Sequence, residues 1–140
     1  FQEWFFCVHS KKPCKPTHVL LWFCNHCWSK FLLNNLILIL SHLLYEDALC
    51  LAEEQSKNGK VGHKRYRCKK VNYWENCDYA SYNGRDVVNS LLVDENVKNL
   101  GHRKTILNPD ISIIGGAVSS HPEYETVIVV DYCNKNCNIK

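Results

Sequence analysis

The 140-residue sequence contains no Met, and its first residue is Phe. We therefore expect either a fragment or an uncertain gene model, with the real start lying further upstream. It also lacks a strong charge of either sign, because the net charge is only +3, which does not by itself indicate a nucleic-acid partner. Only 22% of the residues are charged and 46% are apolar, which excludes a disordered chain and predicts a single globular domain.

Several catalytic signatures are missing as well. The chain has no Gly-x-Ser-x-Gly motif and no phosphate-binding loop. No Ser or Cys stands in a context that marks it as an activated nucleophile. The sequence therefore gives no support to a nucleophilic triad.

No apolar run is long enough to cross a membrane without interruption. The most apolar stretch, residues 19–44, is broken by Asn25, Lys30 and Asn34, whereas a span needs ~20 mostly apolar residues in a row. Membrane contact through residues 19–44 is conceivable but not favoured. We expect residues 1–42 to form an apolar, Cys-rich segment of its own, with a buried or membrane-facing helix over residues 31–44.

Cysteine, in contrast, is abundant, with nine residues in the chain. Such a number indicates disulfides in an oxidising compartment and metal sites in a reducing one, and the odd count leaves at least one without a partner in this chain. Local candidates for disulfides are Cys68 with Cys77 and Cys133 with Cys137. The Cys-x-x-Cys motif at residues 24–27 could form half of a zinc site, but no second pair stands at a suitable distance, so disulfides or free thiols are favoured there.

Apolar periodicity predicts a first amphipathic helix. One face of it is formed by residues at helical spacing, namely Leu44, Ala48, Leu51, Ala52 and Gln55. Gly59 is expected to end this helix. Residues 60–73 are basic and irregular.

A second amphipathic helix is predicted over residues 83–97, with Asn83 or Asp86 as its N-cap. Residues 111–118 read as a buried strand whose Gly pair marks a bulge or close packing. Residues 126–133 form a β-branched strand, and the turn-forming residues between the two strands predict an antiparallel hairpin. The order of elements predicts an α+β layer fold.

Three polar residues that are far apart in the sequence, His63, Glu75 and His102, each stand at the edge of a predicted element. Two imidazoles and a carboxylate suit a divalent ion such as zinc. With only two His ligands, binding would be reversible rather than structural. The alternative is that these are unrelated polar residues in loops, where polar residues collect.

Residues 57–70 contain seven Lys or Arg and no acid. This run could contact phosphate or an anionic membrane, although most such runs are solvated loops. Tyr66 is a single aromatic residue within it, which is too little for a platform on which bases stack. Nucleic-acid binding is therefore not expected.

Residues 43–133 resemble a CAP domain, the superfamily of cysteine-rich secretory proteins, antigen 5 and pathogenesis-related proteins, in its SCP-like form. The resemblance rests on several motifs taken together, which are Glu75-Asn76, Gly101-His102-Arg103, Leu107-Asn108-Pro109, a later Gly at 115 or 116, and a helix followed by His63. Residues 134–140 would then be a Cys-containing tail. Fewer residues separate His63 from Glu75 than the family usually has, and residues 1–40 do not resemble its opening helix.

The resemblance implies an α-β-α sandwich with a central antiparallel sheet. It also implies a cavity of two His and two acids, here His63, Glu75, His102 and Asp94, with Glu95 as the neighbouring acid. His63 and His102 would be the metal ligands, holding zinc or another divalent cation weakly, and Glu75 would accept a hydrogen bond from a ring N–H or join the ligands. Family members are mostly secreted, and several bind sterols or other lipids.

The main hypothesis is therefore an extracellular binding module whose partners are a lipid, a sterol or another extracellular protein. A metal-dependent hydrolase that uses the same cavity, with Glu75 as general base, is the first alternative. The second alternative is a small zinc or nucleic-acid module built on residues 24–27 and 57–70.

Overall fold

One mixed sheet of five strands organises the protein in the computed structural model, which describes residues 30–33 and 36–137. The elements in chain order are β1 (Lys30–Leu33), β2 (Leu36–Leu40), α1 (His42–Asn58), β3 (Trp74–Tyr79), α2 (Gly84–Val93), α3 (Gly101–Ile106), β4 (Ile113–His121) and β5 (Glu125–Cys133). The strand order is β1-β2-β4-β5-β3, and every neighbouring pair is antiparallel except β2 with β4, which is parallel. The predicted antiparallel sheet is therefore correct in all but one pair.

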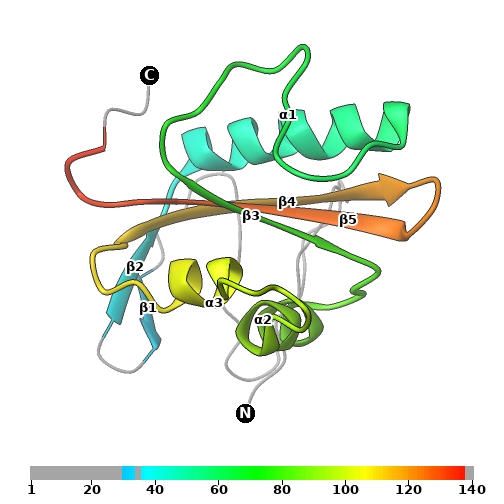
Figure 1. Cartoon of the computed structure of the whole chain (residues 1–140). Helices are drawn as coiled ribbons and strands as arrows, with labels where there is room; N and C mark the ends of the chain where they lie inside the picture. Colours follow the sequence, from blue (N-terminus) through cyan, green and yellow to red (C-terminus); the bar gives the residue numbers. More distant parts are fainter. Residues whose placement is uncertain (1–29, 34–35, 138–140) are drawn as a thin grey trace, which may run out of the picture.

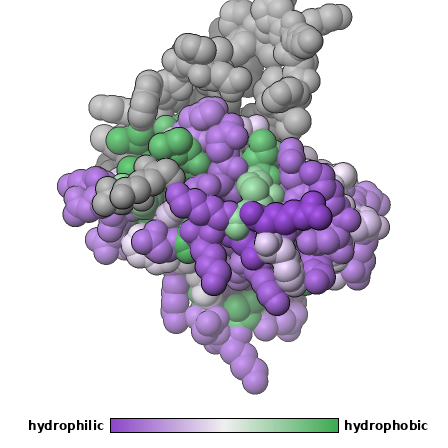
Figure 2. Space-filling view, turned by 90° about the horizontal axis from the view of Figure 1, so that it is seen from above, coloured by the Kyte–Doolittle hydropathy of each residue, from purple (hydrophilic) through white to green (hydrophobic). Residues whose placement is uncertain are grey.

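Helices cover both faces of the sheet, as the predicted α-β-α sandwich requires. Helix α1 lies on one face, and α2 and α3 lie on the other (Figure 1). Two separate apolar clusters fill the interfaces, one between α1 and the sheet and one between α2 and the sheet. Seen from the α1 side, the surface is mainly hydrophilic (Figure 2). The α+β fold class is confirmed.

Helix α1 follows the predicted periodicity. The residues expected on its apolar face, Leu44, Ala48, Leu51, Ala52 and Gln55, are all buried. The Ser41 side chain accepts a hydrogen bond from the backbone N–H of Leu44 at the start of the helix, and Gly59 ends it in the left-handed conformation, at φ 65°. Gly59 as the helix end is confirmed.

Close packing explains the first residue of the Gly pair in β4. A Cβ atom at position 115 would lie 2.3 Å from the backbone nitrogen of Tyr45 and 2.5 Å from the carbonyl carbon of Leu44. Helix α1 therefore rests directly on the backbone of β4, which only Gly permits. Strands β4 and β5 form the predicted antiparallel hairpin, with Gly115 opposite Asp131.

Helix α2 begins where the sequence indicates, because the Asn83 side chain accepts a hydrogen bond from the backbone N–H of Asp86 at 3.0 Å. It ends at Val93 rather than continuing to residue 97, since Asp94 adopts the left-handed conformation at φ 53°. The short helix α3 was not predicted.

The predicted helix over residues 31–44 is wrong. Residues 30–33 and 36–40 form strands, and the helix begins only at His42. The sequence of β2, LILIL, is apolar at every position, so it has no period that distinguishes a buried strand from a buried helix. Residues 24–27, with their Cys-x-x-Cys motif, lie outside the described residues. Within the described part of the chain, every helix is too short or too polar to span a bilayer.

Candidate metal centre

Strand β3 supplies the residues around which the site is built. It is an edge strand, and its side chains alternate between the two layers. Cys77 packs into the cluster beneath α1. Asn76 points the other way, where its side-chain amide donates to Tyr132 Oη at 3.4 Å and to the carbonyl oxygen of His102 at 3.3 Å. Glu75, two residues before Cys77, lies on the α1 side with it.

His63, Glu75 and Cys77 bring three possible metal ligands together. The Nδ1 atom of His63 lies 3.0 Å from Glu75 Oε1 and 3.7 Å from Cys77 Sγ. The three ligand atoms all lie within 4.8 Å of one another. The His63 side chain is 54% exposed, whereas that of Glu75 is only 6% exposed and Cys77 is buried. The cluster thus has an open side at the imidazole and a closed side at the thiol.

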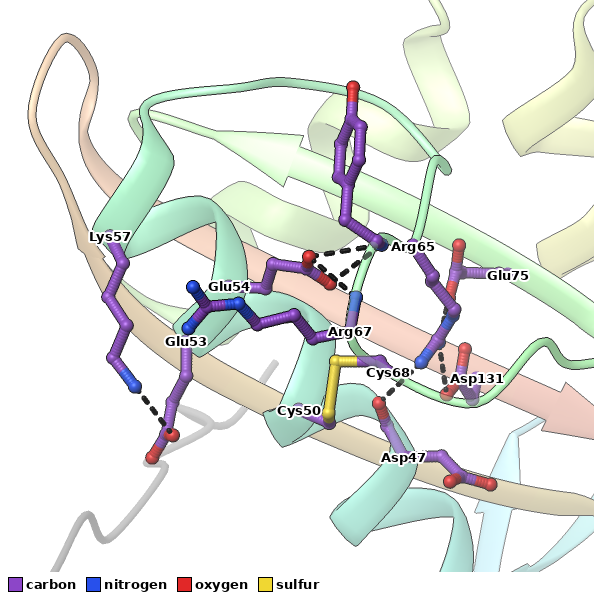
Figure 3. The surroundings of a disulfide bond; sticks show 11 residues. Asp47, Cys50, Glu53, Glu54, Lys57, Arg65, Arg67, Cys68, Glu75 and Asp131 are labelled. Atoms are coloured by element: carbon purple, nitrogen blue, oxygen red, sulfur yellow. Dashed lines mark hydrogen bonds and ion pairs between the residues drawn. A yellow bond between two sulfur atoms is a disulfide. The ribbon is translucent and has the colours of Figure 1, made fainter.

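The segment that carries His63 is attached to α1 at several points. Cys68 forms a disulfide with Cys50 in α1. The carboxylate of Glu54 accepts hydrogen bonds from the backbone N–H groups of Tyr66 and Arg67, at 3.0 and 2.9 Å (Figure 3). These contacts order the basic segment and fix the position of His63.

The predicted disulfide between Cys68 and Cys77 is wrong, whereas that between Cys133 and Cys137 is confirmed. Proximity in sequence was the only basis for pairing Cys68 with Cys77. In the fold, Cys68 lies against α1 while Cys77 points into the core as a free thiol. The fold thus leaves Cys77 available as a ligand.

Arg65 connects two acids behind the cluster. Its guanidinium forms an ion pair with Glu75 and donates to Asp131 Oδ2 at 3.4 Å, and the Arg65 side chain is only 3% exposed. It also donates to the carbonyl oxygen of Asp47 at 2.9 Å (Figure 3). One cation is thus shared by two buried carboxyl groups that face each other across β3 and β5.

The pKa values of these two acids, Asp131 and Glu75, are shifted in opposite directions. Burial, followed by the charge of Glu75, raises the pKa of Asp131 to about 8. Burial also opposes the ionisation of Glu75, but the hydrogen bond with His63 and the charge of Arg65 outweigh it and lower the pKa of Glu75. Burial and the charge of Glu75 raise the pKa of the Cys77 thiol to about 12, so a metal would have to displace its proton.

The other two predicted site residues form a second pair. His102 Nδ1 lies 2.7 Å from Asp94 Oδ1, and Asp94 Oδ2 accepts a hydrogen bond from the backbone N–H of Arg103 at 3.1 Å. Asp94 therefore fixes the ring of His102 at the start of α3 and leaves Nε2 directed elsewhere.

The four predicted residues thus lie as two hydrogen-bonded pairs, His63 with Glu75 and His102 with Asp94. Each pair contacts β3, at the neighbouring residues Glu75 and Asn76. The hydrogen bond expected at Glu75 is present, while a cavity shared by all four residues stays a prediction. A surface hollow lined by residues 109–112 and 134–136 contains none of them.

Cys77 was named from the sequence only as a disulfide candidate and was missed as a possible metal ligand. Its signal was the spacing of two from Glu75, which places both side chains on one face of a strand. That signal has value only once residues 74–79 are known to form a strand.

The profile of the CAP family, the cysteine-rich secretory protein family, matches residues 45–132. This match spans more than half of the chain and agrees with the three-layer fold. The protein belongs to the CAP family. A comparison with curated protein sequences gives no significant match.

Proposed function

We propose that the protein is a secreted CAP module that binds a divalent cation reversibly at His63, Glu75 and Cys77. The observation that carries this proposal is the convergence of three ligand atoms from the loop and β3 within 4.8 Å. The disulfides support an oxidising, extracellular setting.

The mixed donor set favours zinc. Imidazole nitrogen, carboxylate oxygen and thiolate sulfur all bind zinc, and three protein ligands leave the fourth position of a tetrahedron open. Glu75 already engages Arg65 and His63, so metal entry must displace the His63 hydrogen bond. This competition, together with the exposure of His63, makes the bound ion exchangeable.

His102 gives the proposal a second form. Asp94 holds its Nδ1, so Nε2 could serve as a ligand if both rings reach the same ion. In that form the ligands are His63 and His102, with Glu75 and Asp94 as the acids of the cavity.

Calorimetry with zinc on purified protein tests both forms. His63→Ala is expected to lower the affinity at least about tenfold. His42→Ala is the matched control, because His42 is an exposed residue of α1 whose ring, among the described residues, contacts Glu46 and Tyr45. Undiminished affinity in His63→Ala removes the metal site, and undiminished affinity in His102→Ala removes only the two-His form.

The partner of the module belongs to the same proposal. We expect a lipid, a sterol or another extracellular protein, and the support for this is the family resemblance alone. The lipid part of this expectation is measured by co-sedimentation of the protein with vesicles. Sterol-containing and sterol-free vesicles are compared with a sample that contains no vesicles.

A metal-dependent hydrolase is the weaker candidate. Both carboxylate oxygens of Glu75 are engaged, one by His63 and one by Arg65, so Glu75 has no oxygen free to act as a general base. Chelator-sensitive turnover of ester or peptide substrates that is lost in Glu75→Gln would reverse this preference.

A further inference from the structure

The basic segment 57–70 separates its charges into an inner and an outer set. Of its seven Lys and Arg residues, only Arg65 is turned inward, to Glu75 and Asp131. The other six are exposed, and four of them, Lys60, Lys64, Arg67 and Lys70, are named here the cationic loop face. The segment therefore presents most of its positive charge to solvent, while buried Arg65 attaches it to the sheet.

The backbone behind this face is held at both ends and in the middle. The backbone N–H of Gly62 donates to Tyr79 Oη at 2.7 Å, and Cys68 is bonded to Cys50. Between them, Glu54 accepts from two backbone N–H groups of the segment. A partner would meet side chains on an ordered backbone, so less conformational entropy is lost on binding.

Lys60 and Lys64 both contact the same aromatic ring. Their Nζ atoms are 4.2 and 4.8 Å from the centroid of Tyr66, and Lys60 also donates to Tyr66 Oη at 3.1 Å. Within residues 30–33 and 36–137, no carboxylate forms an ion pair with either ammonium group.

Two acids of α1 beside the segment are already engaged. Glu54 is buried and bound to the loop backbone, and Glu53 pairs with Lys57 at 3.7 Å. Two ammonium groups around one ring, with no ion-pair partner among the described residues, create a local positive potential that attracts an anion.

The chemistry of the face selects among anionic partners. The ring of Tyr66 is occupied by two ammonium groups, which leaves it poorly placed to stack on a base. Val61 is the one exposed aliphatic side chain in this loop, and the α1 side of the surface is mainly hydrophilic, so there is little to insert into a bilayer (Figure 2). A polyanion that has neither bases to stack nor acyl chains to contact therefore fits better than a nucleic acid or a membrane.

We propose that the cationic loop face binds a sulfated polysaccharide, with Lys60 and Lys64 as the principal contacts. The repeated sulfate groups of such a chain can pair with the two ammonium groups around Tyr66, and the polymer is hydrophilic throughout. This inference requires no metal at His63, so it stands or falls separately from the cation site.

Heparin is the probe, and binding of the whole chain is measured over a series of salt concentrations. The double variant Lys60→Gln/Lys64→Gln is expected to lose at least about tenfold in affinity and to show a weaker salt dependence, because two contacts with released counter-ions are removed. Lys60→Arg/Lys64→Arg keeps both charges and is expected to bind like the wild type.

The matched control is Lys98→Gln/Lys104→Gln, which removes the same charge from exposed residues of the α2 and α3 layer. It is expected to retain heparin affinity within about twofold, whereas an equal loss in both double variants means that only net charge matters and overturns the proposal. Wild-type protein that binds vesicles containing anionic lipid, or single-stranded DNA, more tightly than heparin at equal salt also overturns it. Heparin affinity measured over the same salt series on protein treated with a chelator must be the same, which keeps this test independent of the metal.

Discussion

Two carboxylate–imidazole pairs approach the edge strand β3 from opposite layers, and they differ in what surrounds them. On the α1 side, Glu75 holds an exposed imidazole, shares Arg65 with a second buried acid and has a thiol beside it. On the other side, Asp94 holds His102 and a backbone N–H and little else. A hydrogen-bonded carboxylate and imidazole can thus form part of a possible metal site, as on the α1 side, or hold the first turn of a helix in place, as at α3. The surrounding side chains decide which.

The largest expected difference between the two sides is energetic. Arg65→Ala leaves Glu75 and Asp131 buried without their cation, and it should lower the free energy of unfolding by about 3–5 kcal/mol. Urea denaturation measures this loss. Arg67→Ala removes an exposed guanidinium two residues away, and should change stability by less than about 0.5 kcal/mol. Equal losses in the two variants would show that the inward charge has no special role.

Dependence of stability on pH should distinguish the α1 side next. Asp131 keeps its proton in the folded protein up to about pH 8, but releases it near its ordinary value of 3.8 when unfolded. The folded state therefore binds more protons in this interval, and the free energy of unfolding falls as pH rises through it, by at most about 1.4 kcal/mol per pH unit.

Glu75 has the opposite sign, since its lowered pKa stabilises the fold above 4.5 and this contribution is lost as pH falls. Denaturation curves of wild type and Asp131→Asn over pH 4 to 8 separate the two effects. A wild-type profile as flat as that of Asp131→Asn would contradict the raised pKa.

The smallest expected effect is on the other side. Asp94→Asn keeps a residue type that accepts the left-handed conformation, but weakens the hydrogen bonds to His102 and Arg103, which should cost about 1 kcal/mol. Zinc affinity should stay unchanged if the ion sits at His63, Glu75 and Cys77. A clear loss of zinc affinity in this variant would instead join both pairs in one cavity.

The success of prediction from sequence followed the strength of the local signals. The periodicity of α1, Gly59 at its end and the β4–β5 hairpin were predicted because each is recorded in neighbouring residues. Strand β2 was missed because its apolar run has no period. Strand β3 was missed because its sequence, WENCDY, mixes acids with apolar residues.

The site was predicted only as far as single residues. Sequence motifs identified His63, Glu75, Asp94 and His102, but not which of them pair. Cys77 lies on the same face of β3 as Glu75, and Asp131 joins Glu75 through the pairing of β3 with β5, which links residues more than 50 positions apart. The inward turn of Arg65 could not be read from a run in which every basic residue looks alike.

The bare Cα of Gly115 controls more than the hairpin that contains it. Helix α1 touches the sheet at that point, and the same helix carries Cys50 and Glu54, which tether the loop that bears His63. The methyl group of Gly115→Ala would push α1 away from β4 and so move the His63 imidazole away from its neighbours. Mutations that abolish the proposed ion binding without changing any ligand should therefore be sought in the middle of the sheet.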